Sequence, residues 1–180
     1  GPLSVNLAGA QLRQPNLLGR IEQLLKDNRL RPDLLQLEIT ENFIMSQAEE
    51  ALAVLHQLKN LGVQLAIDDF GTGYSSLSYL KRLPLDILKI DQSFVRGLPD
   101  DPHDVAIVRA IIALGRSMQF TVIAEGVETQ AQQQFLAAEG CDQIQGYIVS
   151  LPLPPDEFAA TFLRTTVSSF SDSTAEKPSL

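Results

Sequence analysis

The sequence predicts an α/β domain built on a parallel sheet. Short β-rich segments alternate with amphipathic helical segments along most of the 180 residues, and a series of βα units is typical of parallel sheets. The composition fits one globular domain, because 44% of the residues are hydrophobic and the length is that of an ordinary domain. Polar residues also fall at the same end of every predicted strand, where parallel folds build their sites.

Six strands and six helices are predicted from the spacing of apolar residues. The strands cover residues 3–7, 35–39, 63–67, 86–90, 120–124 and 142–146, and the helices cover 16–28, 47–61, 75–83, 103–118, 129–139 and 155–163. In the helix at 47–61, leucines recur at helical spacing, and Gly62 follows as the expected C-terminal stop. These leucines are Leu52, Leu55, Leu58 and Leu61.

The number of βα units leaves two architectures open. Six parallel units fit either an open doubly wound sheet or part of a closed eight-unit barrel. A complete barrel takes about 250 residues, so a barrel of this length would lack about two units. We expect residues 1–164 to form the domain and residues 165–180, rich in Ser and Thr, to form a flexible tail. Gly1-Pro2 is typical of the scar left by tag cleavage.

Composition excludes several classes of partner. Fourteen basic against twenty-two acidic residues give a net charge of −8, which argues against binding of polymeric nucleic acid. No apolar run approaches the roughly 20 residues that cross a bilayer, so we expect no membrane insertion by this segment.

Cys141 is the single cysteine and suggests a reducing compartment. We expect a cytoplasmic domain, compatible with a larger membrane-anchored signalling protein.

Acids, amides or a lysine stand at the C-terminal end of each predicted strand. They are Asn6, Glu38, Asp68, Asp69, Lys89, Asp91, Glu125 and Gln145. Because the ends of parallel strands converge on one face, at least four carboxylates should surround a single mouth. A glutamate within a strand buried on both faces, as predicted for Glu38, is costly unless a cation compensates its charge.

These residue types indicate a site for hard divalent cations. Carboxylate and amide oxygens without His or Cys select Mg²⁺ or Mn²⁺. Adjacent acids such as Asp68 and Asp69 can reach two ions about 3.5–4 Å apart, an arrangement suited to phosphoester hydrolysis, and Lys89 could neutralise charge on the attacking water or a phosphate oxygen. Taken singly, an Asp-Asp pair is more often a helix cap or turn, and Glu41 and Glu128 fit ordinary first-turn acids. The joint arrangement favours a site.

The motifs resemble one known family, the EAL-domain cyclic di-GMP phosphodiesterases. The matching stretches are Ser4-Val5-Asn6-Leu7, Leu37-Glu38-Ile39-Thr40-Glu41, Ala66-Ile67-Asp68-Asp69-Phe70-Gly71-Thr72-Gly73-Tyr74-Ser75-Ser76-Leu77, Leu88-Lys89-Ile90-Asp91, Ile123-Ala124-Glu125-Gly126-Val127-Glu128-Thr129 and Gln145-Gly146-Tyr147. Their order and spacing fit over residues 3–163. The resemblance implies a (β/α)₈-type TIM barrel that cleaves cyclic di-GMP to linear pGpG with Mg²⁺ or Mn²⁺ at a two-metal site.

The resemblance also assigns roles to residues. By it, the metal ligands are Asn6, Glu38, Asp68, Asp69 and Glu125, with Asp68 bridging the two ions. Lys89 would lie near the nucleophilic water, Gln145 would contact the substrate, and Glu41 would hold the loop that follows Asp69. Asp91 and Glu128 match supporting positions.

Two departures from the family pattern set further expectations. No Glu-Ala-Leu motif precedes Asn6, and Ala8-Gly9-Ala10 replaces the usual Ser-Ala-Arg. We therefore expect six of eight barrel units, weak or no activity, and unpaired edge strands that favour a homodimer or strand-exchanged oligomer. An alternative is a degenerate domain that acts as a receptor for cyclic di-GMP or as a protein-interaction module. An unrelated metal enzyme on a doubly wound sheet fits the motifs less well.

Overall fold

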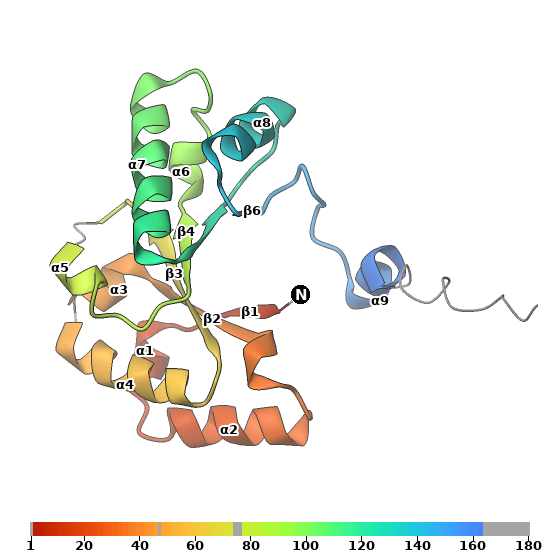
Figure 1. Cartoon of the computed structure of the whole chain (residues 1–180). Helices are drawn as coiled ribbons and strands as arrows, with labels where there is room; N and C mark the ends of the chain where they lie inside the picture. The colour runs from red at the N-terminus through yellow and green to blue at the C-terminus, as the bar shows by residue number, and fades with distance from the viewer. Residues whose placement is uncertain (1, 47, 74–76, 164–180) are drawn as a thin grey trace, which may run out of the picture. The chain divides into compact units, whose positions relative to one another are not determined.

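The computed structural model describes residues 2–46, 48–73 and 77–163, and in them six strands form one parallel sheet (Figure 1). The strands are β1 (Leu3–Asn6), β2 (Leu35–Thr40), β3 (Gln64–Phe70), β4 (Ile87–Ile90), β5 (Thr121–Ala124) and β6 (Gln143–Ile144). They follow one another in the sheet in chain order. A doubly wound sheet reverses its strand order at a switch point, so the sequential order identifies part of a (β/α)₈ barrel, and the predicted fold class is confirmed.

Helices follow the strands, as the sequence predicts. They are α1 (Gly9–Leu12), α2 (Leu17–Asp27), η1 (Pro32–Leu34), α3 (Glu41–Ser46), α4 (Ala48–Asn60), α5 (Leu77–Leu80), α6 (Gln92–Val95), α7 (Pro102–Met118), α8 (Gln130–Glu139), α9 (Pro155–Phe158) and η2 (Ala159–Leu163). The short elements α1, η1, α3 and α6 were not predicted. The helix expected at 75–83 is described only from Leu77, and its described part is the single turn α5.

The chain divides into two compact units, one of residues Gly1–Val149 and one of Ser150–Leu180. The sheet and helices α1 to α8 belong to the first unit. In the second unit, the rings of Phe158 and Phe162 pack with their centroids 5.1 Å apart. The tail expected at 165–180 lies outside the described residues. A domain boundary at residue 164 stays a prediction.

The four inner strands, β2 to β5, pack apolar side chains on both faces of the sheet. On the outer face, side chains such as Leu65, Leu88 and Val122 join the main core with residues of α2, α4, α7 and α8. In Figure 1, α2 and α4 lie beside the first strands and α7 and α8 beside the last. On the inner face, a small separate cluster joins Ala66, Ile87 and Ile123. Burial on both sides explains why these inner strands are nearly all apolar, and why the polar residues at their ends stand out.

The two ends of the sheet, β1 and β6, are edges within the described residues, as expected. All four residues of β1 are exposed, with Leu3 60% and Val5 42% exposed. A hollow of about 510 Å³, lined mostly by apolar side chains, lies between β1 and α2. An edge strand with an apolar flank is a surface on which further protein chain readily pairs.

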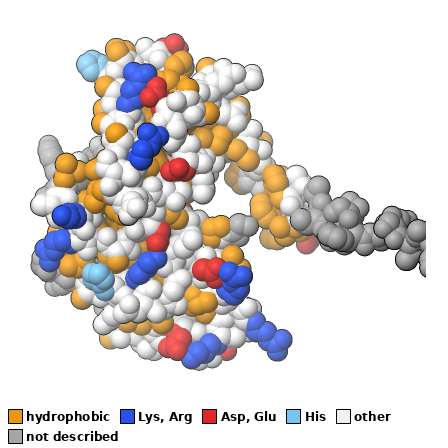
Figure 2. Space-filling view, viewed as in Figure 1, with side chains coloured by type: hydrophobic (Ala, Val, Ile, Leu, Met, Phe, Trp, Pro, Cys, Tyr) orange, Lys and Arg blue, Asp and Glu red, His pale blue; other side chains and the backbone are white. Residues whose placement is uncertain are grey.

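No helix among the described residues is long and apolar enough to cross a membrane. On the face shown in Figure 2, Lys and Arg side chains are dispersed over the described part of the chain and lie among Asp and Glu side chains. On this face the basic side chains of the described residues do not gather into a single stripe (Figure 2).

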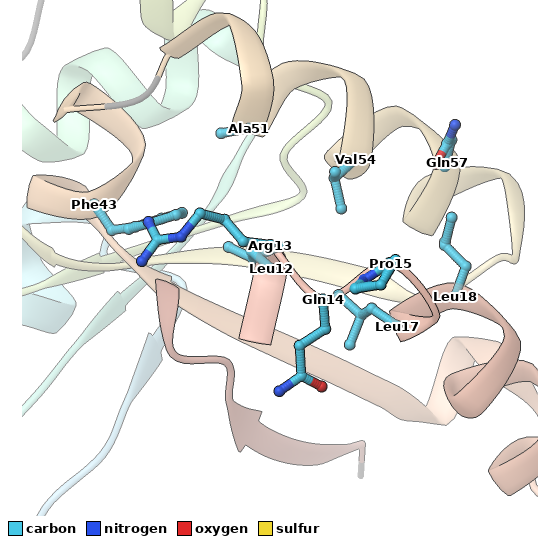
Figure 3. A pocket seen from close by; sticks show the side chains of 10 residues that line it. All are labelled: Leu12, Arg13, Gln14, Pro15, Leu17, Leu18, Phe43, Ala51, Val54 and Gln57. Carbon is cyan, nitrogen blue, oxygen red and sulfur yellow. The ribbon is translucent and has the colours of Figure 1, made fainter. Parts of the chain in front are cut away.

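A separate hollow of about 450 Å³ lies between α1, the start of α2, and α3 and α4 (Figure 3). The Arg13 guanidinium lies over the Phe43 ring, 5.7 Å from its centroid, and the other lining side chains are apolar or uncharged. No acid is among the described residues that line this hollow, and the carboxylates predicted from the sequence gather elsewhere.

Candidate metal centre

Four of the predicted site residues meet at the C-terminal ends of neighbouring strands. Glu38 lies on β2, Asp68 on β3, Lys89 on β4, and Glu125 directly after β5. Glu38 pairs in register with Ala66, which lies two residues before Asp68, so these side chains leave the sheet on its inner face. The same face of the half-barrel therefore receives three carboxylates and one ammonium group from strands that are far apart in sequence.

Lys89 lies at the centre of this group and is 2% exposed. Its Nζ lies 2.8 Å from Glu38 Oε2, 3.0 Å from Asp68 Oδ1 and 2.5 Å from Glu125 Oε1. Burial alone would lower the pKa of Lys89, but the hydrogen bonds with Glu125 and Glu38 outweigh burial and raise this pKa above its usual value. Lys89 is thus a fixed positive charge at neutral pH.

Asp69 reaches the same mouth only because the backbone of β3 is irregular. Successive residues of a regular strand point to opposite faces, which would separate Asp68 from Asp69. The pairing of β3 with β4 shifts register between Ile67 and Phe70, and Asp69 adopts a left-handed conformation with φ of +55°. A bulge of this kind redirects a side chain, and such strain in a non-glycine residue is typical of functional sites.

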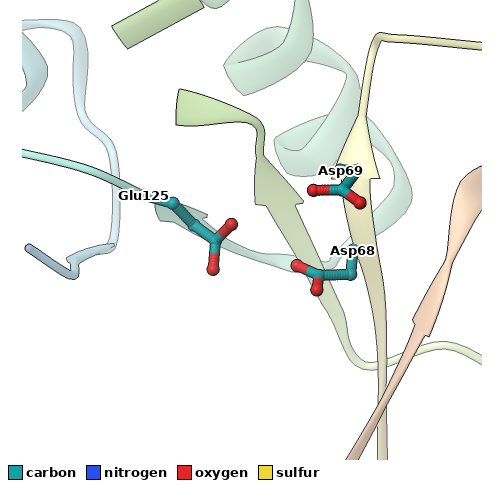
Figure 4. A group of neighbouring side chains, drawn as sticks. All are labelled: Asp68, Asp69 and Glu125. Carbon is teal, nitrogen blue, oxygen red and sulfur yellow. The ribbon is translucent and has the colours of Figure 1, made fainter. Parts of the chain in front are cut away.

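Asp68, Asp69 and Glu125 together form a group with the geometry of a cation site. One carboxylate oxygen from each lies within 4.8 Å of the others, and Figure 4 shows the Glu125 carboxylate directed toward that of Asp68. Asp68 Oδ1 is buried and makes no hydrogen bond among the described residues, although Lys89 Nζ is close to it. An oxygen-only donor set with a buried acceptor lacking a hydrogen bond fits Mg²⁺ or Mn²⁺.

The carboxylates of the mouth differ in acidity. Burial raises the pKa of Glu125, and Lys89 offsets only part of that rise. Burial, the charge of Asp68 and a hydrogen bond with Asp91 raise the pKa of Asp69. Burial also acts to raise the pKa of Asp91, but its hydrogen bonds with Ser93 lower that pKa overall. Burial is the main cause of the two raised pKa values, and the neighbouring negative charges add to it. A divalent cation would favour the charged carboxylates and oppose both effects.

Asp91 and Glu41 shape the segments around the mouth. Asp91 caps α6, and its Oδ1 accepts a hydrogen bond from the Ser93 backbone N–H over 2.8 Å. Glu41 is completely buried, and its Oε2 accepts from the backbone N–H groups of Gly71 and Gly73 over 2.8 and 3.3 Å. Glu41 therefore joins the start of α3 to the loop that follows Asp69.

Three further predicted residues lie on segments next to this group. Asn6 is exposed on β1 and pairs in register with Glu38. Gln145 is exposed after β6, and its backbone N–H donates to the Ala124 carbonyl over 2.8 Å. The exposed Glu128 precedes α8, and its backbone N–H donates to Gln132 Oε1. Asn6 therefore lies on the strand next to Glu38, Gln145 lies after the strand next to β5, and Glu128 lies between β5 and α8.

The sequence reasoning missed one polar residue that contacts the group. Gln36 is 3% exposed, and its Nε2 donates a hydrogen bond to Glu38 Oε1 over 3.1 Å. The signal was present, because residues two apart on a strand share a face. A glutamine two positions before an inward-facing glutamate should itself face inward.

Comparison with known proteins gives the family. The chain matches the EAL domain over residues 1–152. It is 46% identical over 159 residues to the bifunctional diguanylate cyclase/cyclic di-GMP phosphodiesterase MucR of Pseudomonas aeruginosa, covering 88% of this chain and 23% of that protein. The chain spans about a fifth to a quarter of the length of the curated relatives it matches.

Solved structures of relatives share the fold. The PaMucR phosphodiesterase in complex with c-di-GMP is 46% identical, with a TM-score of 0.85 over 87% of this chain and 64% of that chain. The Klebsiella pneumoniae protein BlrP1, solved with manganese and c-di-GMP, is 34% identical, with a TM-score of 0.76 over 82% of this chain and 38% of that chain. With the match to the EAL domain over residues 1–152, they establish that this chain belongs to the EAL-domain family.

Proposed function

We propose that the domain hydrolyses one phosphodiester bond of cyclic di-GMP to give linear pGpG, with two Mg²⁺ or Mn²⁺ ions. The observation that carries the proposal is the convergence of Asp68, Asp69 and Glu125 oxygens within 4.8 Å around a buried lysine. Relatives named as cyclic di-GMP phosphodiesterases and a relative solved with manganese and cyclic di-GMP support the choice of substrate and ion.

Each of the site residues predicted from the sequence has a role in this proposal. Asn6, Glu38, Asp68, Asp69 and Glu125 would hold the ions, with Asp68 between them. When bound, the ions would supply positive charge next to the scissile phosphate and would make a bound water more acidic. Lys89 stabilises negative charge on the attacking water or on a phosphate oxygen. Gln145 contacts the substrate, Glu41 holds the loop after Asp69, and Asp91 and Glu128 support the adjacent segments.

The direct test is turnover in the presence and absence of metal. We expect this chain to convert cyclic di-GMP slowly to pGpG when Mn²⁺ is present, and not at all after chelation with EDTA. Chromatography of the nucleotides measures the conversion. Mn²⁺ or Mg²⁺ at millimolar concentration should also raise the melting temperature, because it relieves repulsion among the carboxylates. If the chain is folded and neither its melting temperature nor its product yield changes when Mn²⁺ is added, the metal-dependent mechanism is ruled out.

A receptor role is the second candidate, because the segment after β1 lacks polar groups that the family pattern carries near the site. Ala8-Gly9-Ala10 offers neither a hydroxyl nor a basic group. Gly9 lies so close to Phe43 that a Cβ atom there would stand 2.0 Å from the ring, which excludes a larger residue in this arrangement. Calorimetric binding of cyclic di-GMP without any pGpG after long incubation would favour the receptor over the hydrolase.

Self-association is the third part of the proposal. The exposed edge β1 and its apolar flank give a second copy a surface to pair with, so we expect a homodimer or strand-exchanged oligomer. The cytoplasmic location expected from the sequence stays a prediction.

Replacing Val5 by Lys should weaken this self-association, because a charge on an edge strand opposes pairing. Light scattering after gel filtration should then shift from a dimer or larger species toward 19.7 kDa. Ile107→Lys is the matched control, since Ile107 is an exposed apolar residue on α7, and it should leave the mass unchanged. A wild-type monomer at about 50 µM, above the micromolar Kd of a weak association, would contradict the proposal.

A further inference from the structure

The inner face of β2 carries a buried polar side chain that none of the roles above uses. Gln36 is 3% exposed and lies two residues before Glu38, so both side chains leave β2 on the same face. Gln36 Nε2 donates to Glu38 Oε1 over 3.1 Å. The other oxygen, Glu38 Oε2, accepts from Lys89 Nζ over 2.8 Å. Each oxygen of this carboxylate thus has its own donor.

Apart from Glu38, the buried side chains on the same face as Gln36 include an apolar cluster that offers an amide no hydrogen bond. The buried cluster on the same face of the sheet consists of Ala66, Ile87 and Ile123, and Ala66 pairs in register with Glu38. An amide removed from water without a hydrogen bond costs a few kcal/mol. An apolar side chain would avoid this cost, so the hydrogen bond to Glu38 is the specific contribution that a glutamine makes at this position.

The two donors to Glu38 differ in what they do to a bound cation. Lys89 is positively charged and competes with a divalent ion for Glu38 Oε2, whereas Gln36 is neutral and does not repel the ion. A hydrogen bond on Oε1 restricts rotation of the carboxylate. It leaves Oε2 facing the point where Lys89 Nζ also meets Asp68 and Glu125.

We propose that Gln36 is a positioning residue that orients the Glu38 carboxylate toward a divalent cation. The inference rests on the proposed function, because it requires Glu38 to be a metal ligand. Groups that orient a ligand through a hydrogen bond typically change metal affinity by 10–100-fold when they are removed. The effect should therefore appear in the affinity for the ion more strongly than in the stability of the fold.

The experiment compares Gln36→Met with Gln64→Met in the 180-residue chain. Methionine keeps the length of glutamine and removes its donor. Gln64 pairs in register with Gln36 on the adjacent strand, which makes it a control for the loss of an amide from the same row. Titration calorimetry with Mn²⁺ should give a Kd at least about 10-fold weaker for Gln36→Met, and a Kd within about twofold of wild type for Gln64→Met.

The outcomes separate this inference from the proposed function. Tight Mn²⁺ binding by wild type with an unchanged Kd in Gln36→Met would overturn the role of Gln36 alone. A wild-type chain that is folded by circular dichroism and does not bind Mn²⁺ would overturn both proposals.

A second measurement needs no variant. The side-chain amide resonance of Gln36, assigned through its own backbone in the labelled wild-type chain, should shift when Mg²⁺ is added, while its protons remain protected from exchange by the bond to Glu38. A resonance that does not move at saturating Mg²⁺ would overturn the inference even if Gln36→Met does not fold.

Discussion

Replacing Lys89 by Met should destabilise the metal-free chain by about 3–5 kcal/mol, the cost of removing one partner from a buried ionic group. The ammonium contacts carboxylates of Glu38, Asp68 and Glu125 at 2.5–3.0 Å, and these side chains are only 7–17% exposed. Without Lys89, three negative charges face one another with little water to screen them. Urea unfolding in EDTA measures the loss.

Lys59→Met is the matched control for Lys89→Met. Lys59 Nζ also contacts a carboxylate, with Asp86 Oδ1 2.5 Å away, but the Lys59 side chain is 37% exposed. A pair so accessible to water contributes about 0–1 kcal/mol. Adding Mn²⁺ should recover much of the stability lost in Lys89→Met, because the ion replaces the missing charge. Equal losses in the two variants would show that Lys89 does not compensate the carboxylates.

The sequence predicts the strands and the polar residues at their ends for a physical reason. A strand buried on both faces is almost wholly apolar, so Glu38 and Lys89 stand out within Leu-Gln-Leu-Glu and Leu-Lys-Ile. Parallel strands then bring those positions to one mouth. Sequential strand order was not predictable from the same pattern, because a doubly wound sheet and a barrel use the same βα units.

Short helices escape sequence reasoning because they contain too few residues to show a period. α1 and α6 have four residues each, which is about one helical turn. Their signals are local, as at α6, where Asp91 caps the N-terminus. In the sequence, an acid that caps a helix cannot be distinguished from an acid of a metal site. Asp91 has both positions, because it caps α6 and also forms a hydrogen bond with Asp69.

The irregular part of the site was also beyond prediction. The left-handed backbone of Asp69 and the register shift between Ile67 and Phe70 depend on how β3 pairs with β4. Strict alternation would have placed Asp69 on the outer face. The resemblance to the family supplied this residue as a ligand, and the geometry explains how two consecutive acids reach one mouth.

Replacing Asp68 by Asn should lower turnover of cyclic di-GMP at least about 100-fold, the usual scale for losing one group that stabilises transition-state charge. Asp68 belongs to the only group of three or more acids with cation-site geometry among the described residues. Its Oδ1 is buried and without a hydrogen bond there. Asparagine keeps the shape but removes the charge that would hold two cations close together. Turnover is compared in the 180-residue chain or, if its rate is too low, in a chain lengthened upstream.

The stability of Asp68→Asn should differ little from that of the parent chain, because Lys89 keeps its contacts with Glu38 and Glu125. Removing the Asp68 charge also lowers the repulsion on Asp69. The raised pKa of Asp69 reflects burial first and then this charge. Asp100→Asn, at an exposed position, is the control and should retain full activity. Because a structural role would reduce stability and turnover together, the expected signature is lost turnover and weaker Mn²⁺ binding at unchanged melting temperature in EDTA. More than a tenth of the parent rate would exclude Asp68 as a ligand shared by two ions.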